Sequence, residues 1–401
     1  MGVDHSRATV SVIIATYNRA GYLAQCLESV LAQSRAPDEI LVIDDGSNDG
    51  TRRVVEGFGN RIRYFWQPNQ GRPTALNLGL ENATGSHLVF FDDDDVLLAG
   101  AVKAHLDVLN AVPDADYSYS PNLAFDEHGP NDSIWDEARH KTLKHRQYAD
   151  PDTLFLRTLE WGEYFLIYLQ GMMIPRQYLE EVGRFQTSLL RGQDYDVMLK
   201  LAWRYRGVST GQPTFIMRNH AGGRGPAIER HSEAERLAMW SKYDRQIVLP
   251  YRDTLPLAAY LDSVASSVCD AQLDDRQVVE AITERARVMF SHGLFDEGVA
   301  NIEAIAGRRE IAPDQWQNAV ELVRHAANIE KPHYLPGKTA LVRDLGRGRY
   351  PRGRKRALTR AAAQGLYWAS RRFMRERRAR QSTMLLVAAA RLAARHARYI
   401  T

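Results

Sequence analysis

Apolar segments of strand length alternate with amphipathic segments of helix length over the first 110 residues, and this alternation constrains the fold more than any other feature. The predicted strands are short and apolar, and they cover residues 10–15, 39–44, 61–66 and 86–91. Predicted helices follow them at 21–33, 51–58, 74–82 and 101–110. Strands joined by helical crossovers run parallel, so we predict an α/β fold with a mixed, mostly parallel sheet covered by helices.

Polar residues follow three of these predicted strands. They are Thr16, Tyr17 and Asn18 after the first, residues 44–47 after the second and Asp92–Asp95 after the fourth. Ligands of such sheets bind outside the carboxyl ends of the strands. Each segment alone could be an ordinary turn, but the three together favour a pocket for a ligand with a base, a sugar and phosphates.

Four consecutive carboxylates, Asp92–Asp95, directly follow the apolar run Leu88–Phe91. Placing four like charges side by side costs free energy unless a positive charge neutralises them. Carboxylate oxygens suit hard divalent cations, so the sequence predicts a Mg²⁺ or Mn²⁺ site. The alternative is a solvated acidic turn that caps a helix starting near Ala99.

Composition bounds the class of protein. With 401 residues and 44% apolar content, the chain is long enough for two or three domains with real cores. Only two cysteines, Cys26 and Cys269, are present, which excludes a disulfide framework and a multi-cysteine zinc site. We expect Cys26 to be a core residue. The sequence shows neither a secretory leader nor an apolar run of membrane-spanning length, and a cytoplasmic location is therefore expected.

The remaining sequence is predicted to be helical after an α/β domain that ends near residue 230. Residues 231–342 are predicted to form a helical domain, with successive helix pairs at 278–329, and 343–401 form a separate basic helical tail. The tail has 17 Lys and Arg against two acidic residues, a net charge of +15. Because the whole chain carries only +3, the first 342 residues sum to −12.

Several motifs, taken in order, resemble family 2 glycosyltransferases of the GT-A fold. They are carried by Ser11–Asn18, Leu41–Thr51, Asn69–Gly71 with Ala75–Asn77, Gly85–Asp95 and Gly192–Asp194. The resemblance implies that residues 1–230 are a GT-A catalytic domain, with a nucleotide-sugar part at about 1–115 and an acceptor part at about 116–230. It also implies a nucleotide-diphosphate sugar as donor and Mn²⁺ or Mg²⁺ as cofactor.

The resemblance assigns the nucleotide to one set of residues. The set comprises Thr16, Tyr17, Asn18, Asp45, Arg72, Asn77, Asp92 and Asp93. Asp45 matches the acid that accepts a hydrogen bond from the base. A carboxylate only accepts, so it selects a base edge with an N–H; uracil fits, and so do thymine and guanine. We favour a UDP-sugar.

The resemblance also assigns the metal and the general base. Asp92-x-Asp94 matches the family's DxD motif, with Asp94 as the direct ligand and His220 as a further ligand or a phosphate donor. Asp194 matches the base of inverting members, which removes a proton from the acceptor hydroxyl. The chain departs from the family where Gln193 replaces a common glutamate and Leu76 replaces a common arginine. A helix N-cap is the alternative interpretation of Asp194.

The acceptor is expected beside Gly171 and Met172, where family members shape the acceptor pocket, with Trp161 upstream as a face for sugar stacking. Such an aromatic residue could equally belong to the core.

The basic tail has two interpretations of equal weight. Arg391, Arg395 and Arg398 share a helical stripe, and Leu385, Leu386, Ala389 and Leu392 lie largely off it. This pattern suits an interfacial helix on an anionic membrane, anchored by Tyr367, Trp368 and Phe373. Alternatively, the helix packs on the acidic body or mediates a homodimer. Nucleic acid is not expected, because no nucleic-acid-binding fold accompanies the charge.

These features predict an inverting, metal-dependent glycosyltransferase that acts on a lipid-linked or oligosaccharide acceptor during surface-glycan synthesis, at the inner face of the cell membrane. A transferase with a peptide or protein acceptor held by the helical region is the second hypothesis. A silent sugar-nucleotide-binding scaffold is the third.

Overall fold

The computed structural model of this chain describes residues 4–128, 132–137, 140–142, 154–159, 167–189, 191–220, 233–261, 270–328, 338, 341, 343–345, 351–375 and 379–397. The chain divides into two compact units. The N-terminal unit comprises Met1–Thr158 and Tyr164–Arg236, and the C-terminal unit comprises Leu159–Glu163 and Leu237–Thr401. The domain boundaries predicted after 230 and 342 lie outside the described residues and stay predictions.

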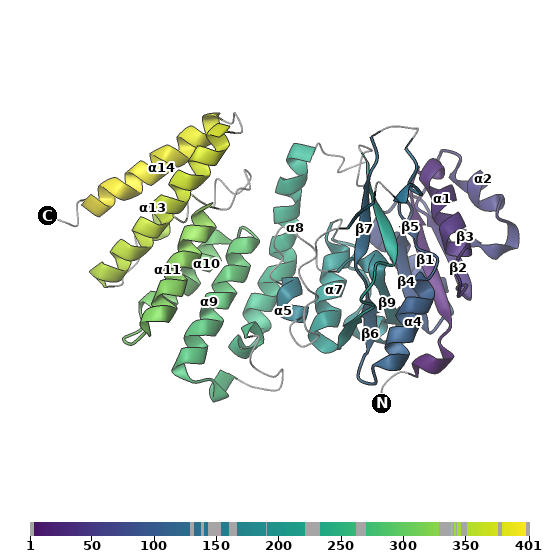
Figure 1. The fold of residues 1–401 in the computed structure, drawn as a ribbon, viewed down its shortest axis with the longest axis horizontal. Coiled ribbons are helices and arrows are strands. Elements are labelled where there is room, and N and C mark those ends of the chain that lie inside the picture. Colours follow the sequence, from purple (N-terminus) through teal and green to yellow (C-terminus); the bar gives the residue numbers. More distant parts are fainter. Residues whose placement is uncertain are drawn as a thin grey trace. The chain divides into compact units, whose positions relative to one another are not determined.

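A seven-stranded sheet forms the centre of the N-terminal unit (Figure 1). Its order is β10-β6-β9-β4-β1-β2-β3. The strands are β1 Val10–Thr16, β2 Glu39–Asp44, β3 Arg63–Trp66, β4 His87–Asp92, β6 Tyr117–Tyr119, β9 Met172–Pro175 and β10 Gly207–Ser209. Only the pairings of β9 with β4 and with β6 are antiparallel among the described pairs of this sheet. The predicted mixed, mostly parallel sheet is confirmed.

A second sheet of four strands, in the order β5-β11-β7-β8, lies beyond the acidic turn that follows β4. It consists of β5 Val96–Leu97, β7 Asn122–Asp126, β8 Lys141–Thr142 and β11 Phe215–Asn219. The apolar stretch from 117 to 125 is split between the two sheets, because β6 ends at Tyr119 and β7 begins at Asn122. Since β5 starts at Val96 and pairs with β11, the second sheet carries Arg218 to the acidic turn.

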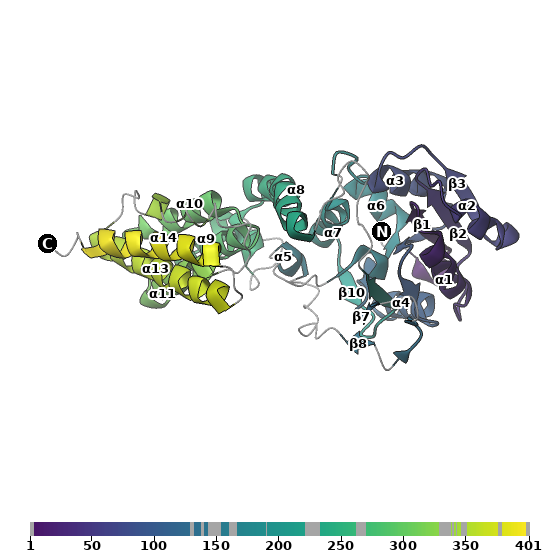
Figure 2. The same ribbon diagram turned by 90° about the horizontal axis from the view of Figure 1, so that it is seen from above.

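Helices cover both faces of the large sheet (Figure 2). They are α1 Ala20–Leu31, α2 Thr51–Glu56, α3 Arg72–Asn82, α4 Ala101–Ala111, α6 Arg176–Val182 and α7 Gln193–Arg204. A further helix, α5 Leu154–Leu159, lies apart from the sheet (Figure 2). Val12 and Ile14 of β1 pack in one core cluster with α1 and α4, whereas Ile13 points to α3 on the other face. This alternation follows the two-residue period of a strand. Up to residue 111, every predicted strand and helix is present, with bounds shifted by at most two residues.

The described elements of the C-terminal unit are all helical, as predicted. They are α8 Glu233–Thr254, α9 Asp275–Ser291, α10 Phe295–Ala306, α11 Pro313–Asn328, α13 Arg352–Arg375 and α14 Ala379–Ala397. Short 3-10 turns lie at Leu257–Tyr260 and Asp270–Gln272. Helix α9 begins with a capping box, in which Asp274 and Gln277 exchange side-chain to backbone hydrogen bonds. Gly293, with φ of 71°, makes the turn between α9 and α10.

The basic tail is part of the core of the C-terminal unit. Helix α13 packs against α11 and α14, and both views show α14 alongside α13 (Figures 1 and 2). Leu385 and Ala389, which the sequence placed on the apolar side of a membrane helix, are buried in the cluster formed with Leu358 and Leu366. The Arg354 guanidinium donates to the Ala306 carbonyl (2.9 Å) and so caps α10. No described helix holds an apolar stretch long enough to cross a membrane.

Candidate active site

Three strand ends meet at one edge of the large sheet. Thr16, the last residue of β1, pairs with Asp44 at the end of β2, and Ala15 pairs with Asp92 at the end of β4. The Asp92–Asp95 turn leads directly into β5, and α4 begins only at Ala101, after Gly100, with no side-chain cap. The acidic run therefore does not cap the following helix, which removes the alternative interpretation of these carboxylates.

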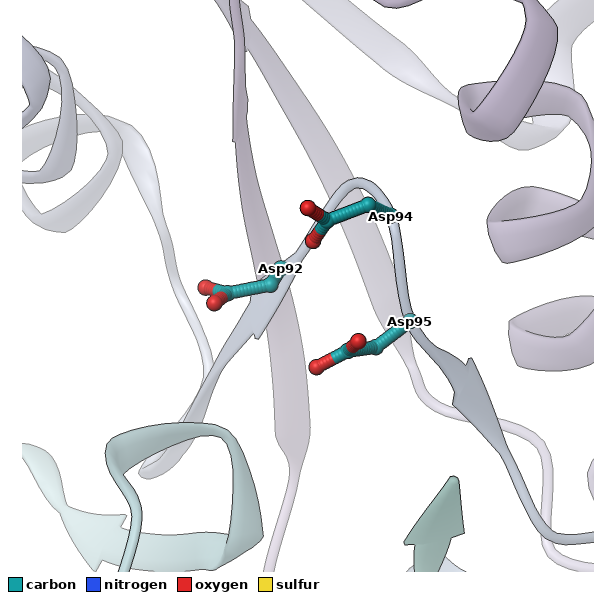
Figure 3. A group of neighbouring side chains, drawn as sticks. All are labelled: Asp92, Asp94 and Asp95. Carbon is teal, nitrogen blue, oxygen red and sulfur yellow. The ribbon is translucent and has the colours of Figure 1, made fainter. Parts of the chain in front are cut away.

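Asp92, Asp94 and Asp95 point to the same side of this turn (Figure 3). Each offers one carboxylate oxygen, and these three oxygens lie within 4.8 Å of one another. Oxygen donors at this spacing suit Mg²⁺ or Mn²⁺. The residues present thus fit the divalent cation that the sequence predicts, and they add Asp95 to the predicted pair Asp92 and Asp94.

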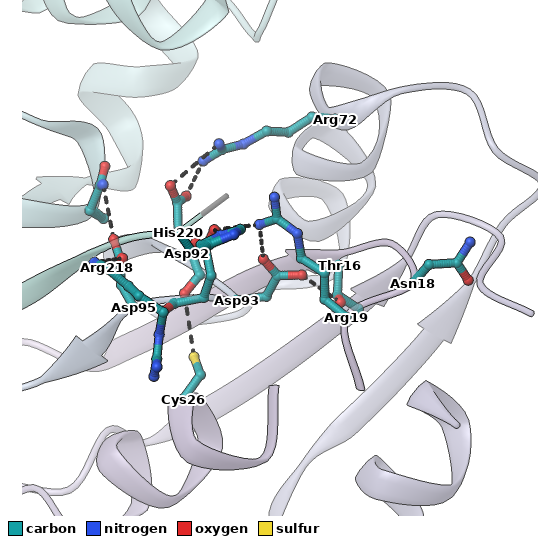
Figure 4. A network of polar contacts seen from close by, with 12 residues as sticks. Thr16, Asn18, Arg19, Cys26, Arg72, Asp92, Asp93, Asp95, Arg218 and His220 are labelled. Atoms are coloured by element: carbon teal, nitrogen blue, oxygen red, sulfur yellow. Dashed lines mark hydrogen bonds and ion pairs between the residues drawn. The ribbon is translucent and has the colours of Figure 1, made fainter. Parts of the chain in front are cut away.

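Asp92 is bound by an arginine from the start of α3. The Arg72 guanidinium forms an ion pair with its carboxylate (Figure 4). Burial raises the pKa of Asp92, against the opposing effect of Arg72, and the negative charges of Asp94 and Asp194 raise it further. For Arg72, burial lowers the pKa, but the charges of Asp92 and Asp194 outweigh it, so that the pKa is raised. Arg72 thus contacts the acidic cluster directly and also interacts electrostatically with Asp194, the predicted general base.

Asp93 and Asp94 share one arginine that the sequence analysis missed. Arg19 Nη1 contacts Asp93 Oδ1 at 2.8 Å and Asp94 Oδ2 at 2.6 Å (Figure 4). The Thr16 hydroxyl donates to Asp93 Oδ2 at 2.7 Å. Burial raises the pKa of Asp93 to about 6, against the lowering effect of Arg19. The only sequence signal for Arg19 is its position directly after Thr16–Asn18.

His220 reaches the same carboxylate as Arg19. Its Nε2 lies 3.0 Å from Asp94 Oδ2, and its ring stacks 4.9 Å from the ring of Tyr22. The structure therefore brings His220 together with Asp94 although they lie 126 residues apart in the sequence. Its role as a metal ligand stays a prediction.

A second arginine that the sequence analysis missed binds the Asp92–Asp95 turn from β11. Arg218 in β11 is 2% exposed, and its Nε donates to the Asp94 carbonyl at 2.9 Å. Its other nitrogens donate to Glu127 (2.7 Å) and Gln25 (2.6 Å), and its backbone N–H donates to Asp95 (2.9 Å). A buried guanidinium with three acceptors fixes the acidic turn in place. No local pattern marks it, because its partners come from α1, from the turn between β4 and β5, and from the residue directly after β7.

Burial also raises the pKa of two further groups at this turn, Asp95 and Cys26. Burial raises the pKa of Asp95 well above its usual range, although the Arg218 backbone N–H lowers it. Burial raises the pKa of the Cys26 thiol well above its usual value, and its Sγ contacts the Asp92 carbonyl at 3.5 Å. Cys26 is a free, fully buried residue, as the sequence predicted.

The predicted base-binding loops are joined by hydrogen bonds. Asn18 adopts a left-handed conformation (φ of 53°), and its side-chain oxygen accepts from the Asn48 N–H at 2.8 Å. Tyr17 beside it is partly exposed. Asp45 Oδ1 accepts from Gln67 Nε2 and the Gln70 N–H, and Oδ2 accepts from the Gly71 N–H. One lone pair of Oδ2 is left for a base N–H.

Asn77 is engaged in packing. Its Nδ2 donates to the Phe185 carbonyl (2.8 Å), and its Oδ1 accepts from the Phe185 N–H (3.0 Å). These bonds tie α3 to the segment after α6. The nucleotide contact predicted for Asn77 stays a prediction and would use the remaining N–H of its amide.

Asp194 lies in the first turn of α7 and is partly exposed. The N-cap of α7 is Gly192, with φ of 72°, so the N-cap interpretation of Asp194 is wrong. Asp194 Oδ1 accepts from the Tyr195 N–H at 2.9 Å. The preceding residue, Gln193, is buried, and its Oε1 has no hydrogen-bond partner among the described residues.

Two of the three predicted acceptor residues lie in the described part of the chain. Gly171 and Met172 are buried. A Cβ on Gly171 would lie 2.7 Å from Phe215 and 2.9 Å from Ser120 Oγ, so glycine is needed for close packing there. Met172 begins β9 opposite Tyr119. Trp161 lies outside the described residues. The acceptor roles of all three stay predictions.

A family model described as Glycosyl transferase family 2 matches residues 11–179. An uncharacterized glycosyltransferase of Rickettsia conorii is 30% identical over 246 residues, which cover 58% of this chain and 38% of that protein. A Campylobacter jejuni protein named GalNAc(5)-diNAcBac-PP-undecaprenol beta-1,3-glucosyltransferase is 31% identical over 187 residues, 45% of this chain and 58% of that one. The chain thus matches only part of the length of these curated relatives.

The solved structure of S. aureus TarS residues 1–349 in complex with UDP-GlcNAc superimposes with a TM-score of 0.50 at 16% identity, over 95% of this chain and 90% of that one. This likeness concerns the fold. Fold and acidic site together place the N-terminal unit in the GT-A class of α/β proteins. Residues 11–179 match glycosyltransferase family 2, the family that the sequence motifs resemble.

Proposed function

We propose that this chain is an inverting, metal-dependent glycosyltransferase that moves a sugar from a nucleotide-diphosphate donor, with a UDP-sugar favoured, to a hydroxyl of a lipid-linked or oligosaccharide acceptor. The observation that carries the proposal is the group of three carboxylate oxygens within 4.8 Å at the end of β4, with Asp194 close enough to act on Asp92 electrostatically. The named substrates of the C. jejuni relative and of TarS support the donor and acceptor classes.

Asp194 acts as the general base in this proposal. It takes the proton from the acceptor hydroxyl while that oxygen attacks the anomeric carbon of the donor. The bond from the anomeric carbon to the diphosphate oxygen breaks, and the departing nucleoside diphosphate keeps the electron pair. The Tyr195 N–H holds Asp194 Oδ1, so Oδ2 accepts the proton; Oδ2 has no hydrogen bond from any described residue.

Asp92 and Asp94 would hold the cation, with Asp95 and His220 as further ligands. A bound divalent cation supplies Lewis-acid neutralisation of the departing diphosphate. The guanidinium groups of Arg72 and Arg19 contact this cluster, and both would bind phosphate oxygens when the donor enters.

The base would lie between the Thr16–Asn18 loop and Asp45. The free lone pair of Asp45 Oδ2 accepts the base N–H, and Tyr17 offers a ring face for stacking. Asp93, which accepts hydrogen bonds from Thr16 and Arg19, would lie near the ribose of the donor.

A thermal-shift panel tests the donor site. UDP, GDP, dTDP and CMP are each added with Mn²⁺ or with EDTA to the wild type and to Asp94→Ala. A ligand at about 100 times its Kd stabilises the folded state by about 2.7 kcal/mol. We expect a Mn²⁺-dependent shift with UDP that is lost in Asp94→Ala. The matched control is Asp107→Ala, an exposed carboxylate on α4 that keeps the shift. An unchanged shift in Asp94→Ala would refute the assignment.

Acceptor class is tested by transfer from the donor that the panel identifies. We expect product with a lipid-linked or oligosaccharide acceptor. Transfer to a peptide alone would replace this part of the proposal with the protein-acceptor hypothesis. Nucleotide binding without turnover in the wild type, on any acceptor, would favour the silent scaffold.

A further inference from the structure

Helix α13 has two faces of different chemistry. One face is buried in the core of the C-terminal unit through small and branched apolar residues: Leu358, Ala361, Ala362, Leu366 and Ala369. The other face is exposed and carries Arg360, Gln364, Tyr367, Trp368 and Arg371. These positions are spaced by three and four residues, so they form one continuous stripe along the helix. The core face is therefore occupied by the protein itself, and only the second face is open to a partner.

The exposed stripe places two large aromatic residues between two cations. Tyr367 is 45% exposed and Trp368 is 48% exposed. Arg324 of α11 lies over the Trp368 ring at 6.0 Å, which fixes one side of the indole. Aromatic side chains with a polar atom favour a boundary between water and an apolar phase. On α14 of the same hairpin, Met384 and Val387 are also exposed.

The charge of this hairpin is of one sign. Helix α13 holds eight Lys and Arg and no acidic residue, and α14 holds three Arg and no acidic residue. Neither Arg360 nor Arg371 has an ion-pair partner among the described residues. A second copy of the same face would bring like charges together, which opposes a homodimer through it. The complementary partner is anionic.

We infer that the exposed stripe of α13, formed by Arg360, Gln364, Tyr367, Trp368 and Arg371, docks the chain on an anionic lipid bilayer. The arginines bind lipid phosphates, and the two aromatic rings insert at the level of the headgroups. This inference deepens the proposed function, because it would hold the chain at the surface where a lipid-linked acceptor lies. It differs from the interfacial helix expected from the sequence, whose apolar residues Leu385 and Ala389 are buried in the core. Phe373, also expected as an anchor, has a side chain outside the described part.

The experiment is co-sedimentation of the full chain with vesicles, without nucleotide or metal. One set of vesicles is pure phosphatidylcholine, and the other contains equal parts of phosphatidylcholine and phosphatidylglycerol. We expect binding to the anionic set only, with a weaker affinity at high salt. The double variant Arg360→Gln/Arg371→Gln should bind about thirty-fold more weakly, because each basic residue near the surface contributes about fivefold.

Arg276→Gln/Arg287→Gln is the matched control, since it removes two exposed arginines from α9 of the same unit. It should bind vesicles as the wild type does. Insertion of Trp368 should shift tryptophan emission to shorter wavelength on binding, and Trp368→Phe should lose most of that shift while it keeps the affinity. This second readout does not depend on charge.

Four results would overturn the inference. The first three are equal binding to neutral vesicles, unchanged binding of the double α13 variant, and binding of a DNA duplex but not of vesicles. The third result would make this face a nucleic-acid surface. Loss of a dimer in the double variant, with no vesicle binding by the wild type, would make it a self-association surface. Hydrolysis of a UDP-sugar in detergent-free solution is measured in parallel, so that a failure of docking and a failure of the proposed transferase activity are seen separately.

Discussion

The two units of this chain bury different kinds of side chain. The N-terminal unit buries charge beneath its sheet edge, including Asp93, Asp94, Asp95 and Arg218. The C-terminal unit buries mostly Ala, Leu, Ile and Val, and it carries its many arginines on the helix surfaces or at helix ends. Burying charge is costly and is retained where a function requires it, whereas small apolar residues let helices approach closely.

This difference separates two kinds of mutational effect. A change in the buried charge network of the N-terminal unit should affect ligand binding, turnover and acid stability. A change in the helical core of the C-terminal unit should affect stability alone. Each prediction below tests this division, and hydrogen exchange followed peptide by peptide measures the two units separately in the intact chain.

The largest expected effect is on turnover. Asp194→Asn removes the only proton-accepting carboxylate proposed for the acceptor, and the rate should fall by about 10²–10⁴-fold. Binding of the nucleotide should stay unchanged, because Asp194 is not among the residues proposed to bind it. Protection from hydrogen exchange should change in neither unit. The rate of sugar transfer or UDP-sugar hydrolysis is measured, with Asp107→Asn as control. A variant that keeps the wild-type rate would disprove the role of Asp194.

The next effect is on the stability of the N-terminal unit. Arg218→Met leaves Glu127 and the Asp94 carbonyl without their buried donor. The loss should be about 3–5 kcal/mol, seen as faster exchange in peptides of β4, β7 and β11. Arg61→Met, at an exposed arginine of the same unit, is the control. If peptides of α9–α11 lose protection equally, the two units do not separate as proposed.

A smaller effect is expected in the helical core. A Cβ on Gly365 would lie 2.2 Å from the Arg324 carbonyl oxygen and 2.8 Å from Ala327 Cβ. Gly365→Ala should therefore force α13 away from α11 and destabilise the C-terminal unit by about 1–3 kcal/mol. Gly353→Ala, on the same helix with open space around it, should be neutral or slightly stabilising. Equal stability of the two variants, or a loss of nucleotide binding in Gly365→Ala, would contradict the comparison.

The smallest effect is the change with pH in the free energy of unfolding that one buried histidine causes. Burial lowers the pKa of His105 to about 3, from about 6.5 when unfolded. The unfolded chain thus binds more protons below about pH 6.5, and the neutral folded histidine costs stability as the pH falls. At pH 5.5 the loss is about 1 kcal/mol. Asp93, with its pKa raised to about 6, acts in the opposite sense.

A variant isolates this contribution. The difference in unfolding free energy between wild type and His105→Gln should shrink by about 1 kcal/mol between pH 7 and pH 5.5. Only the wild type has a histidine that stays neutral when folded and gains a proton when unfolded, so only the wild type loses this stability. His128→Gln, at an exposed position, should track the wild type at both pH values. A constant difference for His105→Gln would show that His105 does not control acid stability.

The local sequence determined much of this protein. Strand and helix periods up to residue 111 depend on neighbouring residues, so their bounds were predicted within two residues. Because the strands run parallel, their carboxyl ends were expected at one edge of the sheet, and the acidic run at Asp92–Asp95 marked the site at that edge. The helical C-terminal region was visible for the same reason.

Only the tertiary structure decided which charges neutralise that site and which helix faces stay exposed. Arg19 directly precedes α1, whereas Arg218 lies in β11 and His220 follows that strand, and no local pattern records a contact made across 126 residues. The same holds for the last two helices. The sequence periodicity of α14 showed an apolar side, but packing against α13 buries its Leu385 and Ala389, whereas Tyr367 and Trp368 of α13 stay exposed. Periodicity reports that a face is apolar, and packing decides what covers it.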